Sequence, residues 1–140
     1  MENLVIWAPI MGMVALAYAF MLTSRVKSSP AGNERMQEIS DAIHEGAMAF
    51  LFREYTILSI FVVLMFVAIG VFIDWQTAIS YILGSITSVL AGYIGMYVAT
   101  KANVRTANAA RESQNMALSI AFSGGAVMGL SVVGLGVIGL

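Results

Sequence analysis

The chain contains four apolar stretches without a charged residue, and this pattern limits its fold more than any other feature. In a helix, about 20 mainly apolar residues cross the hydrocarbon core of a bilayer. Because backbone polar groups in lipid must be satisfied within the segment, each stretch is predicted to be a membrane-spanning helix. The sequence therefore predicts an all-α, polytopic membrane protein, with spans at residues 4–22, 55–73, 78–100 and 116–140.

The composition agrees with a lipid environment and excludes several other classes. Hydrophobic residues make up 59% of the 140 residues and charged residues 11%, well below the quarter that is usual in soluble domains. A net charge of −1 gives no basic field for nucleic acid. With no cysteine and one histidine, disulfides and thiolate metal sites are excluded. We treat residues 1–140 as a single membrane segment.

The first stretch has small residues that resemble a signal-peptide cleavage site. A signal peptide begins with basic residues, whereas this chain begins with Glu2 before a longer apolar run. We therefore interpret residues 4–22 as an uncleaved span.

Basic residues predict the orientation of the spans. All seven lie in two connections, at residues 25–53 and 101–111, while the short connection near Asp74 has none. Because basic loops stay in the cytoplasm, both ends of the segment are expected outside.

The longer connection contains a predicted amphipathic helix at residues 34–54 that continues into the second span. Apolar residues at helical spacing, among them Ile39 and Ile43, form one face, and four acidic residues form the other. We interpret the acidic face as solvated rather than metal-binding. Glu54 falls on the face of Ile39 and Ile43, toward the protein interior. An ion path is one interpretation of this position. We favour an interfacial ion pair of Glu54 with one of four neighbouring cations, Arg53, Lys101, Arg105 or Arg111.

Small residues recur on one side of the third and fourth spans, and such faces let helices approach closely. A nucleotide-binding loop at Ser123-Gly124-Gly125 is excluded because no strand precedes it and no Gly-Lys-Ser or Gly-Lys-Thr follows. Two small faces in a short chain predict partners in a larger bundle. The predicted packing residues are Gly84, Ser88, Ala91, Gly92, Gly95, Gly125, Gly129 and Gly136.

The spans contain no ionisable group of the kind that transport through lipid usually requires. The two aspartates, Asp41 and Asp74, are expected on opposite membrane sides, so carboxylates cannot converge on a metal ion. The chain alone is therefore predicted to be a scaffold without catalytic, cofactor-binding or metal-binding residues.

Three segments closely resemble the ion-translocating membrane pyrophosphatases, which couple pyrophosphate hydrolysis to proton or sodium pumping. They are AFLFREY at residues 49–55, AGYIGMYVATKANVRTANAARES at 91–113, and AFSGGAVMGLSVVGLGVIGL at 121–140. The part from Ala102 to Thr106 is the most specific. Ser123 looks more like the sodium-pumping, potassium-stimulated members.

The resemblance implies that the chain is the N-terminal part of a bundle of about sixteen helices, lying mainly in its outer layer. Later helices are implied to bind magnesium pyrophosphate, with Mg²⁺, K⁺ and Na⁺ as ions of the full-length protein. Implied partners are the remaining helices of the polypeptide, the bilayer and a second copy in a homodimer. The implied location is a prokaryotic inner membrane.

Two other functions remain open on the sequence. A complete four-helix accessory or assembly protein would have these spans, although residue 140 lies inside an apolar stretch. A small multidrug carrier is disfavoured because the first span lacks an acidic residue for proton exchange.

Overall fold

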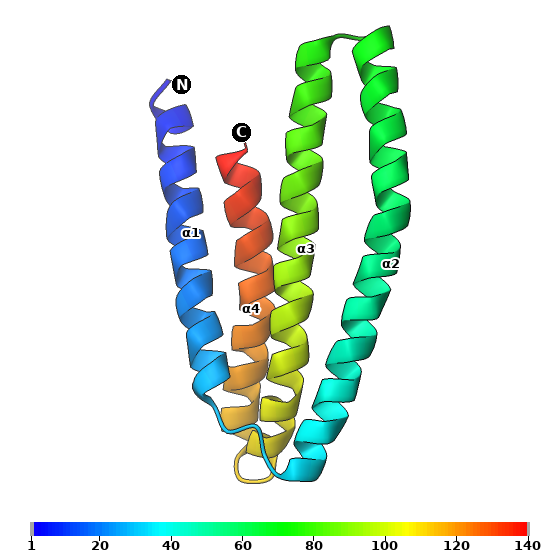
Figure 1. Cartoon of the computed structure of the whole chain (residues 1–140). Helices are drawn as coiled ribbons and strands as arrows, with labels where there is room; N and C mark the ends of the chain where they lie inside the picture. Colours follow the sequence, from blue (N-terminus) through cyan, green and yellow to red (C-terminus); the bar gives the residue numbers. More distant parts are fainter. Residues whose placement is uncertain (1, 140) are drawn as a thin grey trace.

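The computed structural model describes the backbone of residues 2–139 and the side chains of residues 7–139. This part of the chain forms four helices that run alternately up and down (Figure 1). The ends of the described chain point the same way, and the α1–α2 and α3–α4 connections lie at the opposite end. The prediction of an all-helical fold with four long apolar helices is confirmed. The helices are α1 (Glu2–Ser28), α2 (Glu34–Phe72), α3 (Trp75–Ala110) and α4 (Gln114–Ile138).

Polar side chains set the starts of the last three helices. Asn33, Asp74 and Ser113 have extended backbones and accept hydrogen bonds from amides three residues later. Such N-caps satisfy amides that have no partner within the helix. Gly32 has a φ of 86°, a left-handed conformation that favours glycine in the turn before α2.

Two helices are much longer than a bilayer requires. The 39 residues of α2 extend about 58 Å at 1.5 Å per residue, against about 30 Å for the hydrocarbon core. The amphipathic helix predicted at 34–54 is therefore continuous with the second span, as expected. The third span also continues as helix to Ala110, so the basic segment after residue 100 is a rigid extension followed by a short turn.

Helices α1, α3 and α4 pack around one small core formed by Ala19, Leu22, Val98 and Val127. Helices α1 and α4 approach closely at two glycines. A Cβ atom added at Gly12 would lie 2.7 Å from the carbonyl oxygen of Gly134, so the two backbones meet where neither residue has a side chain.

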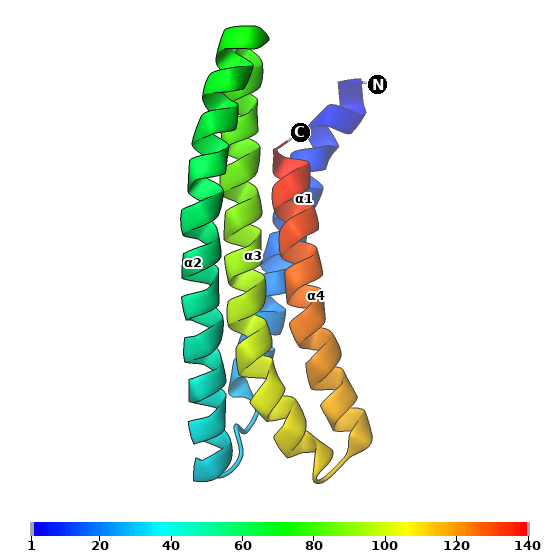
Figure 2. The same cartoon turned by 90° about the vertical axis from the view of Figure 1, so that its right-hand side faces the viewer.

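Within the described part of the chain, α2 packs against α3 alone. Figure 2 shows the two helices side by side along their length. The residues of α2 that are buried here include Ser40 and Leu51, whereas Ile39 and Ile43 are each 49% exposed. The side of α2 that faces α3 is a mixed one that carries Ser40, His44 and Leu51, and at this level His44 meets Thr100 of α3.

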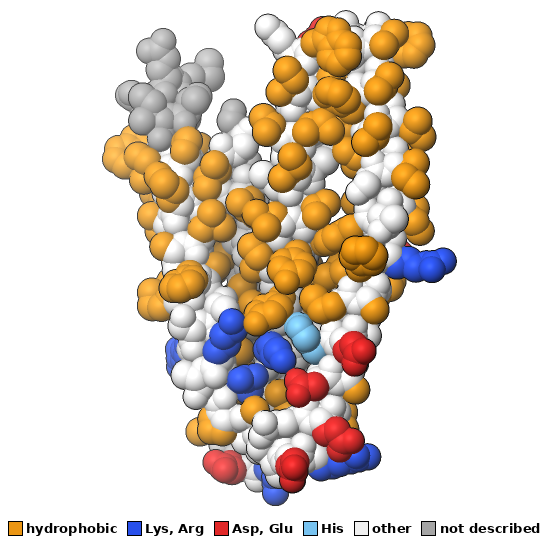
Figure 3. Space-filling view, viewed as in Figure 1, with side chains coloured by type: hydrophobic (Ala, Val, Ile, Leu, Met, Phe, Trp, Pro, Cys, Tyr) orange, Lys and Arg blue, Asp and Glu red, His pale blue; other side chains and the backbone are white. Residues whose placement is uncertain are grey.

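Much of the remaining surface is apolar. Phe72 and Phe122 are 86% and 74% exposed, and many other large hydrophobic side chains are uncovered. The space-filling view shows these side chains over most of the bundle, while charged side chains gather toward the end with the α1–α2 connection (Figure 3). Four apolar helices with this surface make the chain an integral, multi-pass membrane protein.

Candidate functional site

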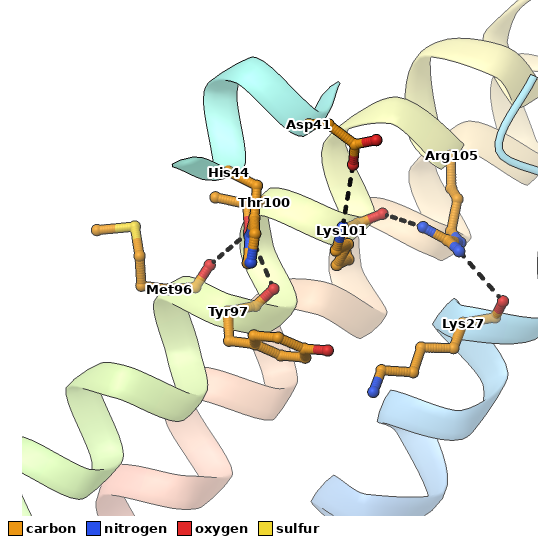
Figure 4. A network of polar contacts seen from close by, with 8 residues as sticks. All are labelled: Lys27, Asp41, His44, Met96, Tyr97, Thr100, Lys101 and Arg105. Atoms are coloured by element: carbon orange, nitrogen blue, oxygen red, sulfur yellow. Dashed lines mark hydrogen bonds and ion pairs between the residues drawn. The ribbon is translucent and has the colours of Figure 1, made fainter. Parts of the chain in front are cut away.

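The main polar cluster of the described residues lies where the end of α1 and the first turns of α2 meet α3 (Figure 4). We call it the boundary cluster, because the long apolar spans end at its level. Its side chains come from three helices that the chain brings together from distant positions. The members are Lys27, Asp41, His44, Tyr97, Thr100, Lys101 and Arg105.

His44 connects α2 to α3 through Thr100. Its Nδ1 atom lies 2.7 Å from the Thr100 hydroxyl, which also lies 3.1 Å and 3.0 Å from the carbonyl oxygens of Met96 and Tyr97. The hydroxyl has one hydrogen, which it donates to these carbonyls. We therefore assign the hydrogen of the ring to Nδ1, which donates to Thr100. The ring also packs edge-on against Tyr97, with ring centroids 5.3 Å apart.

Arg105 connects α3 to the end of α1. Its guanidinium donates to the carbonyl oxygens of Ser29 at 3.1 Å, Lys27 at 3.3 Å and Lys101 at 2.7 Å. The last carbonyls of a helix have no partner within the helix, so a fixed fork of donors satisfies them well. Arg105 therefore determines how the α1–α2 connection begins.

Two further cations complete the boundary cluster. Lys101 donates to Asp41 at 3.4 Å, an ion pair whose aspartate side chain is 73% exposed. Such exposed pairs contribute about 0–1 kcal/mol. The Lys27 ammonium lies 4.9 Å from the centre of the Tyr97 ring, a cation–π arrangement.

The structure separates the predicted packing residues of α3 into two groups. Ala91 and Gly95 are buried, and Gly92 is half-buried. A Cβ atom added at Gly92 would lie 2.8 Å from the Tyr55 hydroxyl, and one at Gly95 would lie 2.6 Å from Met128. Gly84 and Ser88 are exposed, and nothing lies within 4 Å of a Cβ added at Gly84.

In α4 the predicted packing residues are not the ones that contact the other described helices. Gly125, Gly129 and Gly136 are exposed, with nothing within 4 Å of an added Cβ. A neighbouring row of small residues faces α1 and α3 instead. This row was not predicted from the sequence, although small residues recur along it at helical spacing. Its members are Ser123, Gly124, Val127, Ser131 and Gly134.

Comparison with known proteins decides the family. The family model described as "Inorganic H+ pyrophosphatase" matches residues 13–140. This chain belongs to that family.

The chain covers only part of its relatives. A "Putative K(+)-stimulated pyrophosphate-energized sodium pump" of Clostridium tetani is 59% identical over 93% of this chain but only 19% of its own length. A K(+)-insensitive pyrophosphate-energized proton pump of Methanosarcina mazei is 41% identical over 99% of this chain and 21% of its own length. A K(+)-stimulated pyrophosphate-energized sodium pump of Thermotoga maritima is 42% identical over 91% and 18%. The chain thus spans about a fifth of the length of these curated relatives.

The described side chains of this pyrophosphatase-family segment do not fit a magnesium site. Mg²⁺ requires oxygen ligands that converge in near-octahedral geometry. Among the described residues, no three His, Cys, Asp or Glu side chains lie close enough together to hold a metal ion. Asp41 is paired with Lys101, and Glu38 with Arg35.

The predicted ion pair of Glu54 is not formed among side chains 7–139. Arg53 and Glu54 are both exposed, so Glu54 does not point into the described interior as the helical spacing suggested. Arg105, one of the expected partners, binds backbone carbonyls instead. Glu54 is exposed because the buried side of α2 is the side that carries Ser40 and Leu51, and Glu54 does not lie on that side.

Proposed function

We propose that this chain forms the first helices of a pump that couples hydrolysis of inorganic pyrophosphate to ion transport across the membrane. The observation that carries the proposal is the 59% identity to the Clostridium tetani relative over 93% of this chain. Relatives that are named as pumps also match over at least nine-tenths of the chain. The long apolar helices suit a membrane-embedded pump.

Sodium is the ion that we propose for the pump. The relative at 59% identity is named as a putative sodium pump, whereas the named proton pumps are 41% to 44% identical, as is the sodium pump of Thermotoga maritima at 42%. Ser123, whose type first suggested sodium, is 9% exposed and faces the other helices of this chain. K⁺ stimulation is proposed on the same relative's name.

The chemistry of the pump is proposed to lie in helices beyond this segment. The described residues offer no convergent set of carboxylates for Mg²⁺ and pyrophosphate. The relatives are about five times as long as the matched region, which leaves ample chain for such a site. The four helices described here then act as scaffold for the catalytic helices, mainly in an outer layer.

Further proposals concern the setting of the pump. We place it in a prokaryotic inner membrane, with both ends of this segment outside, because six of the seven basic residues lie in or near the two turns at one end of the bundle. The remaining helices of the same polypeptide and a second copy are the proposed protein partners.

Inverted membrane vesicles from cells that express the complete gene product test the proposed function. Adding pyrophosphate with Mg²⁺ and K⁺ should release phosphate and drive uptake of radioactive sodium that survives a protonophore. Uptake that the protonophore abolishes would assign protons instead, and absence of both activities would refute the pump.

A second sample, the 140-residue chain expressed alone, tests where the chemistry lies. We expect it to release phosphate no faster than empty membranes, since its described residues do not form a magnesium site. Metal-dependent hydrolysis by this chain would place the catalytic site within it.

A further inference from the structure

A cavity of about 340 Å³ adjoins the boundary cluster between the end of α1, the first turns of α2 and α3. It is open at one side, and it is lined mainly by polar and charged side chains. The set that decides its chemistry is Lys27, Gln37, Ser40, Asp41, Lys101 and Arg105.

Ser40 is the unusual member of this set. It is the one buried residue of the six, with only 6% of its surface exposed, and it borders the cavity. A hydroxyl in this position can donate a hydrogen bond to a molecule bound there.

The charges around Ser40 favour an anion. Three cations and one carboxylate line the cavity, which leaves two positive charges in excess. The Lys27 ammonium has no ion-pair partner among the described residues and is held over the Tyr97 ring, as Figure 4 shows. Arg105 is fixed by carbonyls, and Lys101 is shared with Asp41, so Lys27 is the cation most available to a ligand.

We propose that this cavity is a binding site for a phosphate group, held by Lys27, Lys101 and the hydroxyl of Ser40. A phosphate oxygen accepts hydrogen bonds from ammonium and hydroxyl donors alike, and a phosphate carries the charge that the cavity lacks. The source is either the headgroup of an anionic phospholipid or inorganic phosphate. The proposal does not depend on the pump function.

The position of the cavity makes the lipid headgroup the simpler source. Lys27 follows the first apolar span closely, and Lys101 directly follows the third. In Figure 3 a group of basic side chains on this face lies at the border between the apolar surface and the charged end of the molecule, and others lie further down and at the right-hand edge. Basic pockets between membrane helices at the cytoplasmic boundary are suited to anionic headgroups, and Tyr97 is a typical interfacial residue.

Three variants of the complete gene product, purified in detergent, test the site. Ser40→Ala removes the buried hydroxyl and leaves the charges. Lys27→Gln removes the free cation. Arg111→Gln is the matched control, because it removes an exposed cation from the same side of the molecule outside the cavity. Binding is measured with short-chain phosphatidylglycerol, with phosphatidylcholine of the same chain length, and with inorganic phosphate.

We expect the unmodified protein to bind phosphatidylglycerol more tightly than phosphatidylcholine. Ser40→Ala should weaken binding about tenfold, as expected for a lost hydrogen bond to a charged group, and Lys27→Gln about fivefold. Arg111→Gln should change it less than about twofold.

The probes identify the source of the phosphate. Site-dependent binding of phosphatidylglycerol that inorganic phosphate does not displace assigns a lipid headgroup, whereas site-dependent binding of inorganic phosphate with no preference between the two lipids assigns the free anion. Two results would overturn the proposal: unchanged binding of both anions in Ser40→Ala and Lys27→Gln, which leaves only water in the cavity, or an equal loss in Arg111→Gln, which indicates diffuse attraction.

Discussion

At the scale of single residues, Asp74 shows how a turn between two apolar helices is fixed. Its carboxylate accepts hydrogen bonds from the Thr77 hydroxyl at 2.7 Å and the Thr77 amide at 2.8 Å. These bonds favour the ionised form and lower the pKa of Asp74 below its ordinary value of 3.8, the hydroxyl having the larger effect. The carboxylate thus stabilises the start of α3 more strongly when it is charged.

This gives a pH-dependent prediction. The folded pKa of Asp74 is below the unfolded one, so its contribution is complete above pH 3.8 and is lost as the pH falls through the lower folded pKa. We expect Asp74→Ala to lower the unfolding temperature in detergent by a few degrees at neutral pH, and Asp74→Asn by less, since Asn is also a good N-cap. If the Ala variant shows the same loss at pH 7 and well below pH 3.8, the carboxylate is not the cause.

A second residue-scale prediction concerns Arg105. Its three donors bind carbonyls of Lys27, Ser29 and Lys101, and a lysine cannot reproduce this fork. We expect Arg105→Lys to destabilise the fold by about 2 kcal/mol, in the range for hydrogen bonds that involve a charged group. Limited proteolysis should then cut the α1–α2 connection faster. Arg111→Lys, at an exposed position, serves as the control, and equal sensitivity of both variants would contradict the assigned role.

At the scale of whole helices, α4 carries two rows of small residues with different surroundings. An added Cβ at Gly134 would lie 3.0 Å from the carbonyl oxygen of Gly12, whereas one at Gly125 meets nothing within 4 Å. Gly134→Leu should therefore force α1 and α4 apart and lower the free energy of unfolding of the 140-residue chain by about 1–3 kcal/mol. Gly125→Leu should leave that chain unchanged and should destabilise the complete protein, where we propose that another helix covers Gly125.

The exposed row of α4, formed by Gly125, Gly129 and Gly136, contacts either another helix of the complete protein or lipid. To distinguish the two, the unfolding temperatures of Gly134→Leu and Gly125→Leu are measured both in the 140-residue chain and in the complete protein. If Gly125→Leu is as harmless in the complete protein as in the 140-residue chain, no helix packs there and that face contacts lipid.

The positions of the four helices could be predicted from the sequence, but the side of each helix that packs against its neighbours could not. The lengths of the apolar stretches predicted four helices, and Asn33 and Asp74 mark two of their starts. The faces were harder, because in lipid both the exposed and the packed side of a helix are apolar. Gly124 and Gly125 are adjacent, and either could have led the packed row. The role of Arg105 was also hidden, since it binds carbonyls that every residue has, rather than the carboxylate of Glu54.

At the scale of the molecule, the arrangement of helices and the distribution of charge agree. The ends of the described chain point one way, and six of the seven basic residues lie near the two turns at the other end, whereas Arg53 lies midway along α2 (Figure 1). The α2–α3 pair extends beyond the bilayer at the basic end, where the boundary cluster ties it to α1. A single orientation therefore places six of the seven basic residues on the same side of the membrane, with Arg53 midway along α2.

That orientation can be tested with two cysteines on one helix. Gln76 and Asn103 lie near opposite ends of α3, both are exposed, and the chain has no cysteine of its own. Because basic segments stay in the cytoplasm, an impermeant thiol reagent added to intact cells should label Gln76→Cys and spare Asn103→Cys. Both variants should react equally in detergent, which controls for local accessibility. Labelling of Asn103→Cys alone in intact cells would reverse the orientation, and with it the side on which we place the phosphate cavity.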